Sequence, residues 1–370
     1  MHILFAGGGT AGHINPALAI AGYIKEKHPD ARISYIGTPD KLESRLVPEK
    51  GYDFHTIEVA GFQRSLSLKN IKRNIDAVYK AVTSSAEARK ILKELQPDIV
   101  IGTGGYVSGP VLREAAKLGI KNAIHEQNAF PGVTTKMLIK RTNAIMLAMP
   151  EAKRYLKLNK EPVITGNPIR TELLKITKQE AKEKLGLDSR PVILSFGGSL
   201  GARRINEAVT ELIKYHNGSG KYYHIHAAGK AGYDTMKQNL SDITLANEID
   251  FREYITDMDL CMAAADLVIC RAGAITLSEL QGCGKPSILI PSPYVAENHQ
   301  FHNAMTLKNI GAAELIEEKD LSGEGLIKVV ESLIGNKEKL SEMAKKAREN
   351  AIIDANERIY EVVMKLYNSK

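Results

Sequence analysis

Tryptophan is absent from this chain of 370 residues, and cysteine occurs only three times, at Cys261, Cys270 and Cys283. The cysteines form no C-x-x-C pair, so neither a disulfide framework nor a zinc site is indicated, and a reducing cytoplasm is the expected compartment. No run approaches the roughly 20 apolar residues that span a bilayer. The apolar start Ile3–Phe5 breaks at Gly7, unlike a secretory signal. Any contact with a membrane is therefore expected to be peripheral.

Acidic residues are outnumbered by basic ones, which gives a formal net charge of +7 and a pI near 9.0. Such a balance points to polyanionic partners, which include nucleic acid, an acidic membrane face and phosphorylated substrates. The G-x-S-x-G elbow of one class of serine hydrolases is missing. A length of 370 residues predicts about two domains.

Short β-branched runs alternate with stretches of helical periodicity along the whole chain, which favours parallel sheets covered by helices. The strands expected in the first half are Ile3–Ala6, Ile33–Ile36, Ile99–Ile101, Ala123–His125 and Ala144–Leu147. Those expected in the second half are Val192–Phe196, Tyr222–His226, Leu267–Cys270 and Ser287–Ile290. The turn-rich segment Pro162–Pro168 separates the halves. We predict domains over residues 1–163 and 164–350, and a helix over 351–370 that packs back on the first.

The first glycine loop, Gly7 to His13, lies between a strand and a helix and satisfies G-x-G-x-x-G. A dinucleotide-binding domain would also need an acidic residue at the tip of the second strand, which instead ends Ile36-Gly37-Thr38. The loop is therefore interpreted as a general phosphate cradle. His13 at the helix start is a structural cap, a catalytic base or a ligand contact, and the sequence leaves these three roles open.

Two more glycine-rich loops follow strands, at Gly102–Pro110 and Gly197–Arg203. Each could be a site where a helix packs closely on a strand, but three such loops in one chain favour phosphate binding.

The stretch from Asp266 to Gln300 concentrates groups suited to a nucleotide sugar. A helix expected from Ala274 offers a phosphate seat at its start, where Gly273 allows close approach. Glu279 lies one turn further along, where a carboxylate can accept hydrogen bonds from a ribose diol. The polar loop Glu297–Gln300 suits hydroxyl-rich ligands. The alternative is an ordinary strand–loop–helix unit.

Two further patterns in the sequence concern metal binding and contact with a membrane. His299 and His302 form H-x-x-H without a third ligand at sensible spacing, so no metal site is expected. After Gly61-Phe62-Gln63-Arg64, an apolar segment to Val82 is interleaved with basic residues, and a second basic group follows Pro131. This composition is typical of a helix lying on an anionic bilayer, or of a helix that faces its own core. The basic residues are Lys69, Lys72, Arg73, Lys80, Lys136, Lys140 and Arg141.

Seven motifs in order, GGGTAGHINPALAI, GTGGYVSGP, HEQNAFPG, GNPIR, SFGGSLGAR, RAGAITLSEL and ENHQ, resemble the MurG family of bacterial glycosyltransferases. The resemblance implies an α/β GT-B fold of two Rossmann-like parallel-sheet domains facing across a cleft. It implies that the first domain binds the acceptor lipid and docks on the membrane, while the second binds the donor.

The implied reaction moves N-acetylglucosamine, with inversion, from UDP-N-acetylglucosamine to the C4 hydroxyl of undecaprenyl-pyrophosphoryl-N-acetylmuramyl pentapeptide in peptidoglycan synthesis. The implied location is the anionic cytoplasmic face of the cell membrane. Other cell-wall synthesis proteins are possible partners, whereas nucleic acid, cofactors and metals are not expected.

The resemblance also assigns residues. Glu279 would take the ribose hydroxyls, backbone near Ile255 the uracil, and Arg170 with Ser199 the diphosphate. The catalytic assignments are His13, Tyr106 and Asn128. The donor-binding assignments are Thr10, Gly12, Asn128, Arg170, Ser199, Ile255, Ala274, Ile275, Thr276, Glu279, His299 and Gln300. The acceptor pyrophosphate is assigned to Gly8, Gly9, Thr10, Gly104 and Gly105. At His299 some members have glutamine, and Tyr254 is a second position where the pocket wall is expected to vary.

Three alternative functions remain open beside the transferase hypothesis. Another GT-B enzyme, such as a UDP-sugar epimerase or an antibiotic-type glycosyltransferase, would share the fold and the donor. A non-catalytic sensor of nucleotide sugars would bind the donor without transfer. A dinucleotide oxidoreductase would use the first loop alone.

Overall fold

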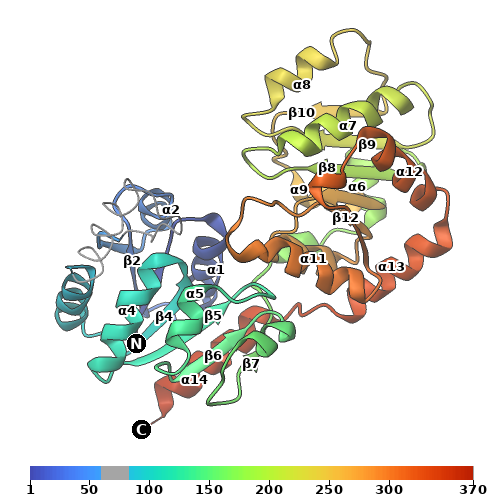
Figure 1. The fold of residues 1–370 in the computed structure, drawn as a ribbon. Helices are drawn as coiled ribbons and strands as arrows, with labels where there is room; N and C mark the ends of the chain where they lie inside the picture. Colours follow the sequence, from blue (N-terminus) through green and yellow to red (C-terminus); the bar gives the residue numbers. More distant parts are fainter. Residues whose placement is uncertain (60–82, 370) are drawn as a thin grey trace. The chain divides into compact units, whose positions relative to one another are not determined.

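The computed structural model describes residues 1–59 and 83–369 and divides them into two compact units (Figure 1). The first unit comprises Met1–Pro168 with Ile353–Lys370, and the second comprises Ile169–Ile352. The observed division thus falls a few residues beyond each of the two predicted boundaries. The predicted basic segment from Gly61 to Val82 lies outside the described residues.

The first unit is built on a seven-stranded parallel sheet in the order β3-β2-β1-β4-β5-β6-β7. The predicted strands of this half are confirmed. The short edge strands β3 and β7 were not predicted, because four and two residues carry too little periodicity. The strands are β1 (His2–Gly7), β2 (Arg32–Gly37), β3 (Asp53–Thr56), β4 (Ile99–Gly104), β5 (Lys121–Glu126), β6 (Ala144–Leu147) and β7 (Val163–Ile164).

Helices cover both faces of this sheet, so its central strands are apolar on both sides. The helices are α1 (Ala11–Lys27), α2 (Glu43–Glu49), α4 (Gly105–Lys117), α5 (Val133–Leu138), the 3₁₀ helix η1 (Pro150–Tyr155) and α14 (Ala355–Asn368); residues 83–95 are also helical. Helix α14 is the last element of the chain, yet its Ile359 and Val363 are fully buried in the core beside α1. The Tyr360 hydroxyl and His28 Nε2 are hydrogen-bonded at 2.7 Å. The C-terminal helix therefore completes the first unit.

The second unit holds a six-stranded parallel sheet in the order β10-β9-β8-β11-β12-β13. Its strands are β8 (Val192–Phe196), β9 (Tyr223–Ala227), β10 (Ile249–Arg252), β11 (Leu267–Cys270), β12 (Ser287–Leu289) and β13 (Ala313–Leu315). Its helices are η2 (Thr171–Leu174), α6 (Lys178–Lys184), α7 (Arg203–His216), α8 (Tyr233–Asn239), α9 (Met258–Ala264), α10 (Ala274–Cys283), η3 (Ala296–Asn298), α11 (His299–Asn309), η4 (Glu318–Asp320), α12 (Gly323–Ile334) and α13 (Lys337–Glu349). The main core lies where α7 and α12 cover one face of the sheet.

Both sheets reverse their strand order at one point, between β1 and β4 in the first unit and between β8 and β11 in the second. In open parallel sheets, ligands bind outside the carboxyl ends of the strands at such a reversal. The glycine-rich turns that the sequence singled out all follow these four strands. In the described ranges, no helix has the length and apolar character needed to cross a bilayer.

A chain of buried polar side chains runs beneath the second sheet's first loop. Ser195 Oγ lies 2.7 Å from His224 Nε2 and 2.7 Å from His226 Nδ1, and His224 Nδ1 lies 3.2 Å from His216 Nε2. Burial lowers the pKa of His216 to about 4 and that of His226 to about 3, and it also lowers the pKa of His224. The folded protein therefore holds these histidines neutral.

We predict that the second unit loses stability as the pH falls below 6.5. The unfolded chain binds protons near that ordinary histidine pKa, whereas the folded chain binds them only near pH 4 and below. Each histidine should then contribute a loss of about 1.4 kcal/mol per pH unit. Urea unfolding followed between pH 7.5 and 5 measures the slope, and His216→Phe should reduce it. A free energy of unfolding that stays constant from pH 6.5 to 5 would contradict the prediction.

Candidate active site

The first glycine loop is held in place by a buried carboxylate from α2. Glu43 is fully buried and accepts hydrogen bonds from the Gly9 amide at 3.1 Å, the Thr38 amide at 3.1 Å and the Thr38 hydroxyl at 2.8 Å. A Cβ at Gly8 would lie 2.2 Å from a Glu43 oxygen, so this position requires glycine. Sequence reasoning missed Glu43, although an acidic residue shortly after the second strand was a signal that could have found it.

His13 is fastened to the same loop through one ring nitrogen. Its Nδ1 lies 3.1 Å from the Gly8 carbonyl oxygen and 3.3 Å from the Thr10 hydroxyl. Because a carbonyl oxygen can only accept, Nδ1 carries the proton and Nε2 of the neutral ring keeps its lone pair. That nitrogen faces the second loop, where a Cβ added to Gly104 would lie 3.0 Å from it. This geometry allows Nε2 to accept a proton. The hydrogen bond from Nδ1 also stabilises the loop.

The second loop, which joins β4 to α4, touches the first. Gly104 and Gly105 have φ values of +108° and +78°, and a Cβ at Gly105 would lie 2.4 Å from the Gly8 carbonyl oxygen. The five residues assigned to the acceptor pyrophosphate therefore lie on two adjoining backbone turns. Tyr106 follows at the start of α4 with 61% of its surface exposed.

A second buried carboxylate shapes the loop after β5. Glu126 accepts hydrogen bonds from the backbone and side-chain amides of Asn128 at 3.0 and 3.1 Å, from the Gly132 amide at 3.0 Å and from the Thr135 hydroxyl at 2.5 Å. The loop continues into α5, whose Thr134 hydroxyl donates to the Gly105 carbonyl oxygen at 3.3 Å. The first unit thus brings His13, Tyr106 and Asn128 to the ends of three neighbouring strands.

The segment that leaves the first unit is anchored to the same loop. His125 Nε2 lies 3.0 Å from the Gly166 carbonyl oxygen, and the Asn167 side-chain amide donates to the Gln127 carbonyl oxygen at 3.2 Å. Burial lowers the pKa of His125, so the ring stays neutral and acts as a fixed link.

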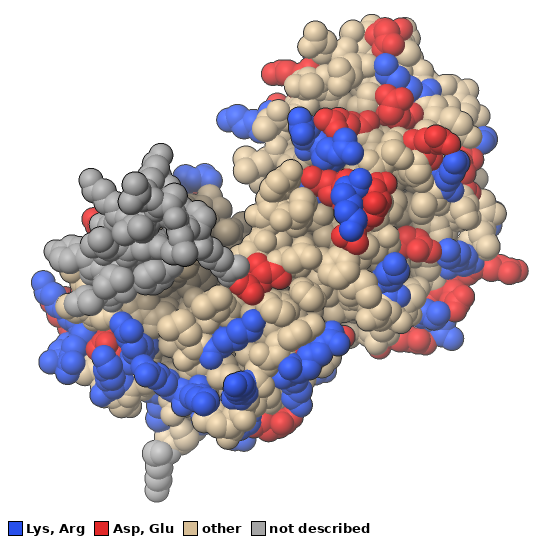
Figure 2. Space-filling view, viewed as in Figure 1, with Lys and Arg blue, Asp and Glu red and all other residues tan. Residues whose placement is uncertain are grey.

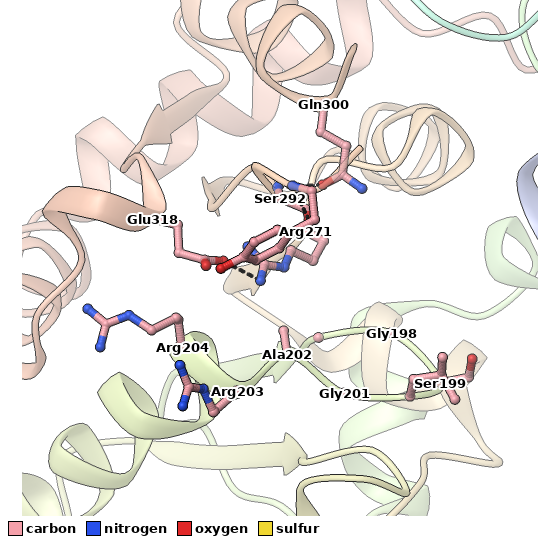
Figure 3. A pocket seen from close by; sticks show the side chains of 13 residues that line it. Gly198, Ser199, Gly201, Ala202, Arg203, Arg204, Arg271, Ser292, Gln300 and Glu318 are labelled. Atoms are coloured by element: carbon pink, nitrogen blue, oxygen red, sulfur yellow. Dashed lines mark hydrogen bonds and ion pairs between the residues drawn. The ribbon is translucent and has the colours of Figure 1, made fainter. Parts of the chain in front are cut away.

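In the second unit, a cavity of about 460 Å³ opens at the reversal of strand order (Figure 3). Its walls are the glycine loop Gly197–Arg204, Arg271, Ser292, Tyr294, Gln300 and Glu318. Two predicted donor contacts, Ser199 and Gln300, therefore line one cavity. The Gln300 side-chain oxygen accepts from the Ser292 amide at 2.9 Å, which fixes its orientation.

Arg271 crosses this cavity wall and joins two of its loops. Its guanidinium donates to the carbonyl oxygens of Ile290 and Pro291 at 3.2 Å each and forms an ion pair with the buried Glu318, as Figure 3 shows. The turn after β11 is thus tied to the loop after β12 that leads to His299 and Gln300. This pairing could not be predicted from local sequence, because Arg271 and Glu318 lie 47 positions apart.

Helix α10 begins directly after the turn that follows β11, with Gly273 as its N-cap. No side chain caps the helix and no acidic residue lies in its first turn. Its partial positive charge is therefore not neutralised by a local carboxylate, which suits an anion at Ala274, Ile275 and Thr276.

Glu279 on α10, predicted to accept hydrogen bonds from a ribose diol, is paired with Arg170. Both of its oxygens accept hydrogen bonds from Arg170, from Nε at 2.7 Å and from Nη2 at 3.1 Å. The family resemblance assigned these residues to different parts of the donor, and the structure brings them together. The role of Arg170 at the diphosphate stays a prediction.

The remaining donor assignments fall on two segments of the second unit. Ile255 is buried, and its neighbour Tyr254 has 60% of its surface exposed. His299 opens α11, where its Nδ1 lies 2.8 Å from the Ala296 carbonyl oxygen. Glu297 and Asn298 before it have φ values of +56° and +50°, which are strained for residues with side chains. In residues 1–59 and 83–369, no group of three or more His, Cys, Asp or Glu could hold a metal ion.

Two family models match the chain in order. Residues 3–147 match the glycosyltransferase family 28 N-terminal domain, and residues 192–359 match the glycosyltransferase family 28 C-terminal domain. The two models thus account for the core of each unit.

Several proteins resemble the chain over its full length. A relative from Acetivibrio thermocellus, named UDP-N-acetylglucosamine–N-acetylmuramyl-(pentapeptide) pyrophosphoryl-undecaprenol N-acetylglucosamine transferase, is 48% identical over 100% of this chain and 99% of its own. A Clostridioides difficile relative of the same name is 42% identical over 100% of this chain and 90% of its own.

Among solved structures, MurG of Acinetobacter baumannii matches with a TM-score of 0.81 and 28% identity over 98% of this chain and 99% of its own. The calicheamicin glycosyltransferase CalG4 matches with a TM-score of 0.72 and 15% identity over 99% of this chain and 98% of its own, a likeness of fold alone. The predicted GT-B architecture of two parallel-sheet α/β domains is confirmed. By its full-length identity to curated relatives and its two domain models, the chain belongs to the MurG family of glycosyltransferases.

Proposed function

We propose that the chain transfers N-acetylglucosamine from UDP-N-acetylglucosamine to the C4 hydroxyl of N-acetylmuramyl-(pentapeptide) pyrophosphoryl-undecaprenol, with inversion, in peptidoglycan synthesis. The full-length identity to relatives of that name carries the proposal. The loops around His13 and the start of α10 supply groups that such a reaction needs.

The departing UDP develops negative charge that must be stabilised. Amides at a helix start are preorganised for this and need no reorganisation during the reaction. In the second unit, the start of α10, which has no acidic residue in its first turn, and the glycine loop with Ser199 offer such groups. These groups can act without a metal ion, since they already supply partial positive charge where the diphosphate leaves.

The acceptor hydroxyl must lose its proton as it attacks. Nε2 of neutral His13 holds a lone pair because Nδ1 carries the ring proton and donates it in a hydrogen bond to the Gly8 carbonyl oxygen. We assign His13 as the general base, because a neutral imidazole with a lone pair on Nε2 can accept the proton of the acceptor hydroxyl. The adjoining turns at Gly9 and Gly104 have backbone exposed to a ligand and are proposed to seat the pyrophosphate of the acceptor.

We further propose that the first unit docks on the anionic cytoplasmic face of the membrane. Lys and Arg side chains gather on this unit in the face that Figure 2 shows. Met137 and Val133 of α5 are 69% and 50% exposed. The exposed residues Lys140 and Arg141 follow shortly after this helix. Exposed apolar groups bordered by basic side chains suit an anionic bilayer surface.

The function is tested by incubating the purified protein with labelled UDP-N-acetylglucosamine and a prenyl-pyrophosphoryl muramyl acceptor. Label that moves into the butanol-soluble fraction supports the transferase. Free sugar or an epimer released without any acceptor would favour a hydrolase or epimerase of the same fold. Tight donor binding without transfer would favour a sensor.

We predict that His13→Asn lowers kcat by about 10²- to 10⁴-fold, the usual contribution of a general base, with a much smaller effect on donor affinity. Asparagine retains a donor for the Gly8 carbonyl oxygen but cannot accept the proton of the acceptor. Initial rates at saturating donor, with UDP binding measured separately, check this. Unchanged turnover in the variant would exclude His13 as the base.

We predict that Glu279→Ala weakens donor binding by about 10- to 100-fold, because hydrogen bonds to a charged group contribute roughly 1.5–3 kcal/mol. The effect should appear in KM for the donor far more than in kcat at saturation. Binding of 2′,3′-dideoxy-UDP should be nearly unchanged by the substitution. Equal losses for UDP and the dideoxy compound would contradict a contact with the ribose diol.

We predict that the double variant Lys140→Gln with Arg141→Gln binds anionic vesicles about 30-fold more weakly, since each basic side chain near such a surface contributes about 1 kcal/mol. Sedimentation with vesicles containing phosphatidylglycerol measures this. The matched control removes Lys328 and Lys345 of the second unit, and its binding should be unchanged. Equal losses in both double variants would contradict docking through the first unit.

A further inference from the structure

Arg170 and Glu279 form a two-pronged ion pair within the second unit. The guanidinium donates from Nε to one carboxylate oxygen at 2.7 Å and from Nη2 to the other at 3.1 Å. Such a fork fixes the plane of the carboxylate as well as its position, which a lysine ammonium cannot do.

The two side chains differ in burial, and this difference indicates that Arg170 holds Glu279 in place. The Glu279 side chain is 7% exposed, whereas that of Arg170 is 54% exposed. A carboxylate so deeply placed needs a partner for its charge. The hydrogen bonds that Arg170 donates to Glu279 are the main cause that raises the pKa of Arg170. The charge of the guanidinium is therefore already matched by Glu279.

The backbone of Arg170 is fixed on the same helix that carries its partner. Arg170 is the N-cap of η2, and the Cys283 thiol of α10 donates to the Leu173 carbonyl oxygen in η2 at 3.6 Å. The segment η2 also packs directly against α10. The arginine thus approaches the carboxylate from a segment that packs against α10, the helix that carries Glu279.

Each carboxylate oxygen has two lone pairs, and the fork uses one on each. Each oxygen can therefore accept one further hydrogen bond, and two neighbouring hydroxyl groups could donate these bonds. A guanidinium neutralised in this way attracts a diphosphate less than a free one would.

We propose that Arg170 is a positioning residue that orients the Glu279 carboxylate toward the cis-diol of the nucleotide ribose, and that it does not act through the diphosphate. This inference rests on the proposed function, because it takes a uridine nucleotide to bind beside α10. It makes the pair a specificity determinant for ribonucleotides over 2′-deoxyribonucleotides.

Calorimetric titration of the full chain with UDP, UMP and 2′-deoxy-UDP tests the proposal. The wild type is compared with Arg170→Gln, Arg170→Lys, Glu279→Gln and the double variant Arg170→Gln with Glu279→Gln. We expect Arg170→Gln to weaken UDP and UMP by the same factor, about 10- to 100-fold, and to reduce the preference of UDP over 2′-deoxy-UDP. Arg170→Lys should lose nearly as much, and Arg170→Gln should cost little further affinity in the Glu279→Gln background.

Arg190→Gln provides a matched control, since it removes another arginine that bonds both oxygens of a carboxylate, that of Asp188. It should leave the nucleotide affinities unchanged. The double variant removes the buried charge together with its partner, so it keeps the test valid if Arg170→Gln alone folds poorly.

The positioning role would be overturned if Arg170→Gln weakened UDP much more than UMP, if Arg170→Lys largely restored the affinity, and if the loss persisted in the Glu279→Gln background. Such a result would indicate that Arg170 contacts the diphosphate. Failure of the wild type to bind any uridine nucleotide would instead overturn the proposed function, and this inference with it.

Discussion

Buried carboxylates hold the working loops of this protein in shape. Glycine-rich turns at the ends of parallel strands have little side-chain packing of their own, so the backbone needs other anchors. Glu43 binds the amide of the first glycine loop, and Glu126 binds four donors around Asn128. In the second unit, Glu318 pairs with Arg271, which ties two loops of the cavity together. Glu43 and Glu126 gain several hydrogen bonds and Glu318 gains an ion pair, and these interactions offset the cost of removing each charge from water.

This arrangement has a consequence for the chemistry. A loop fixed by buried anchors can present backbone amides and a histidine nitrogen in one geometry, without reorganisation when a ligand arrives. The outward sides of these loops carry glycine, so a phosphate can approach the backbone closely there. Arg170 and Glu279 follow the same rule with one difference, because here the anchored carboxylate is itself the group that we propose to meet the substrate.

The alternation of apolar runs predicted both sheets, since strands covered on two faces must be apolar along their whole length. It missed β3, β7, β10 and β13, which are too short to show a clear period, and it placed the boundary between the units before Pro168 rather than at it. The glycine loops, the start of α10 and the importance of Glu279 were visible because loop, helix start and polar residue are close in sequence. Glu43, the Arg271–Glu318 pair and the Arg170–Glu279 fork were not, because their partners are joined only by folding.

The amino-acid sequence by itself determined the two α/β units, the glycine-rich turns and the family, because all three are properties of local pattern and of motif order. Only the tertiary structure decided which polar side chains pair with one another. Residues 109 positions apart, Arg170 and Glu279, share one ion pair because η2 packs on α10. A partner chosen by packing leaves no mark in the local sequence, since either side chain would look the same if it faced solvent.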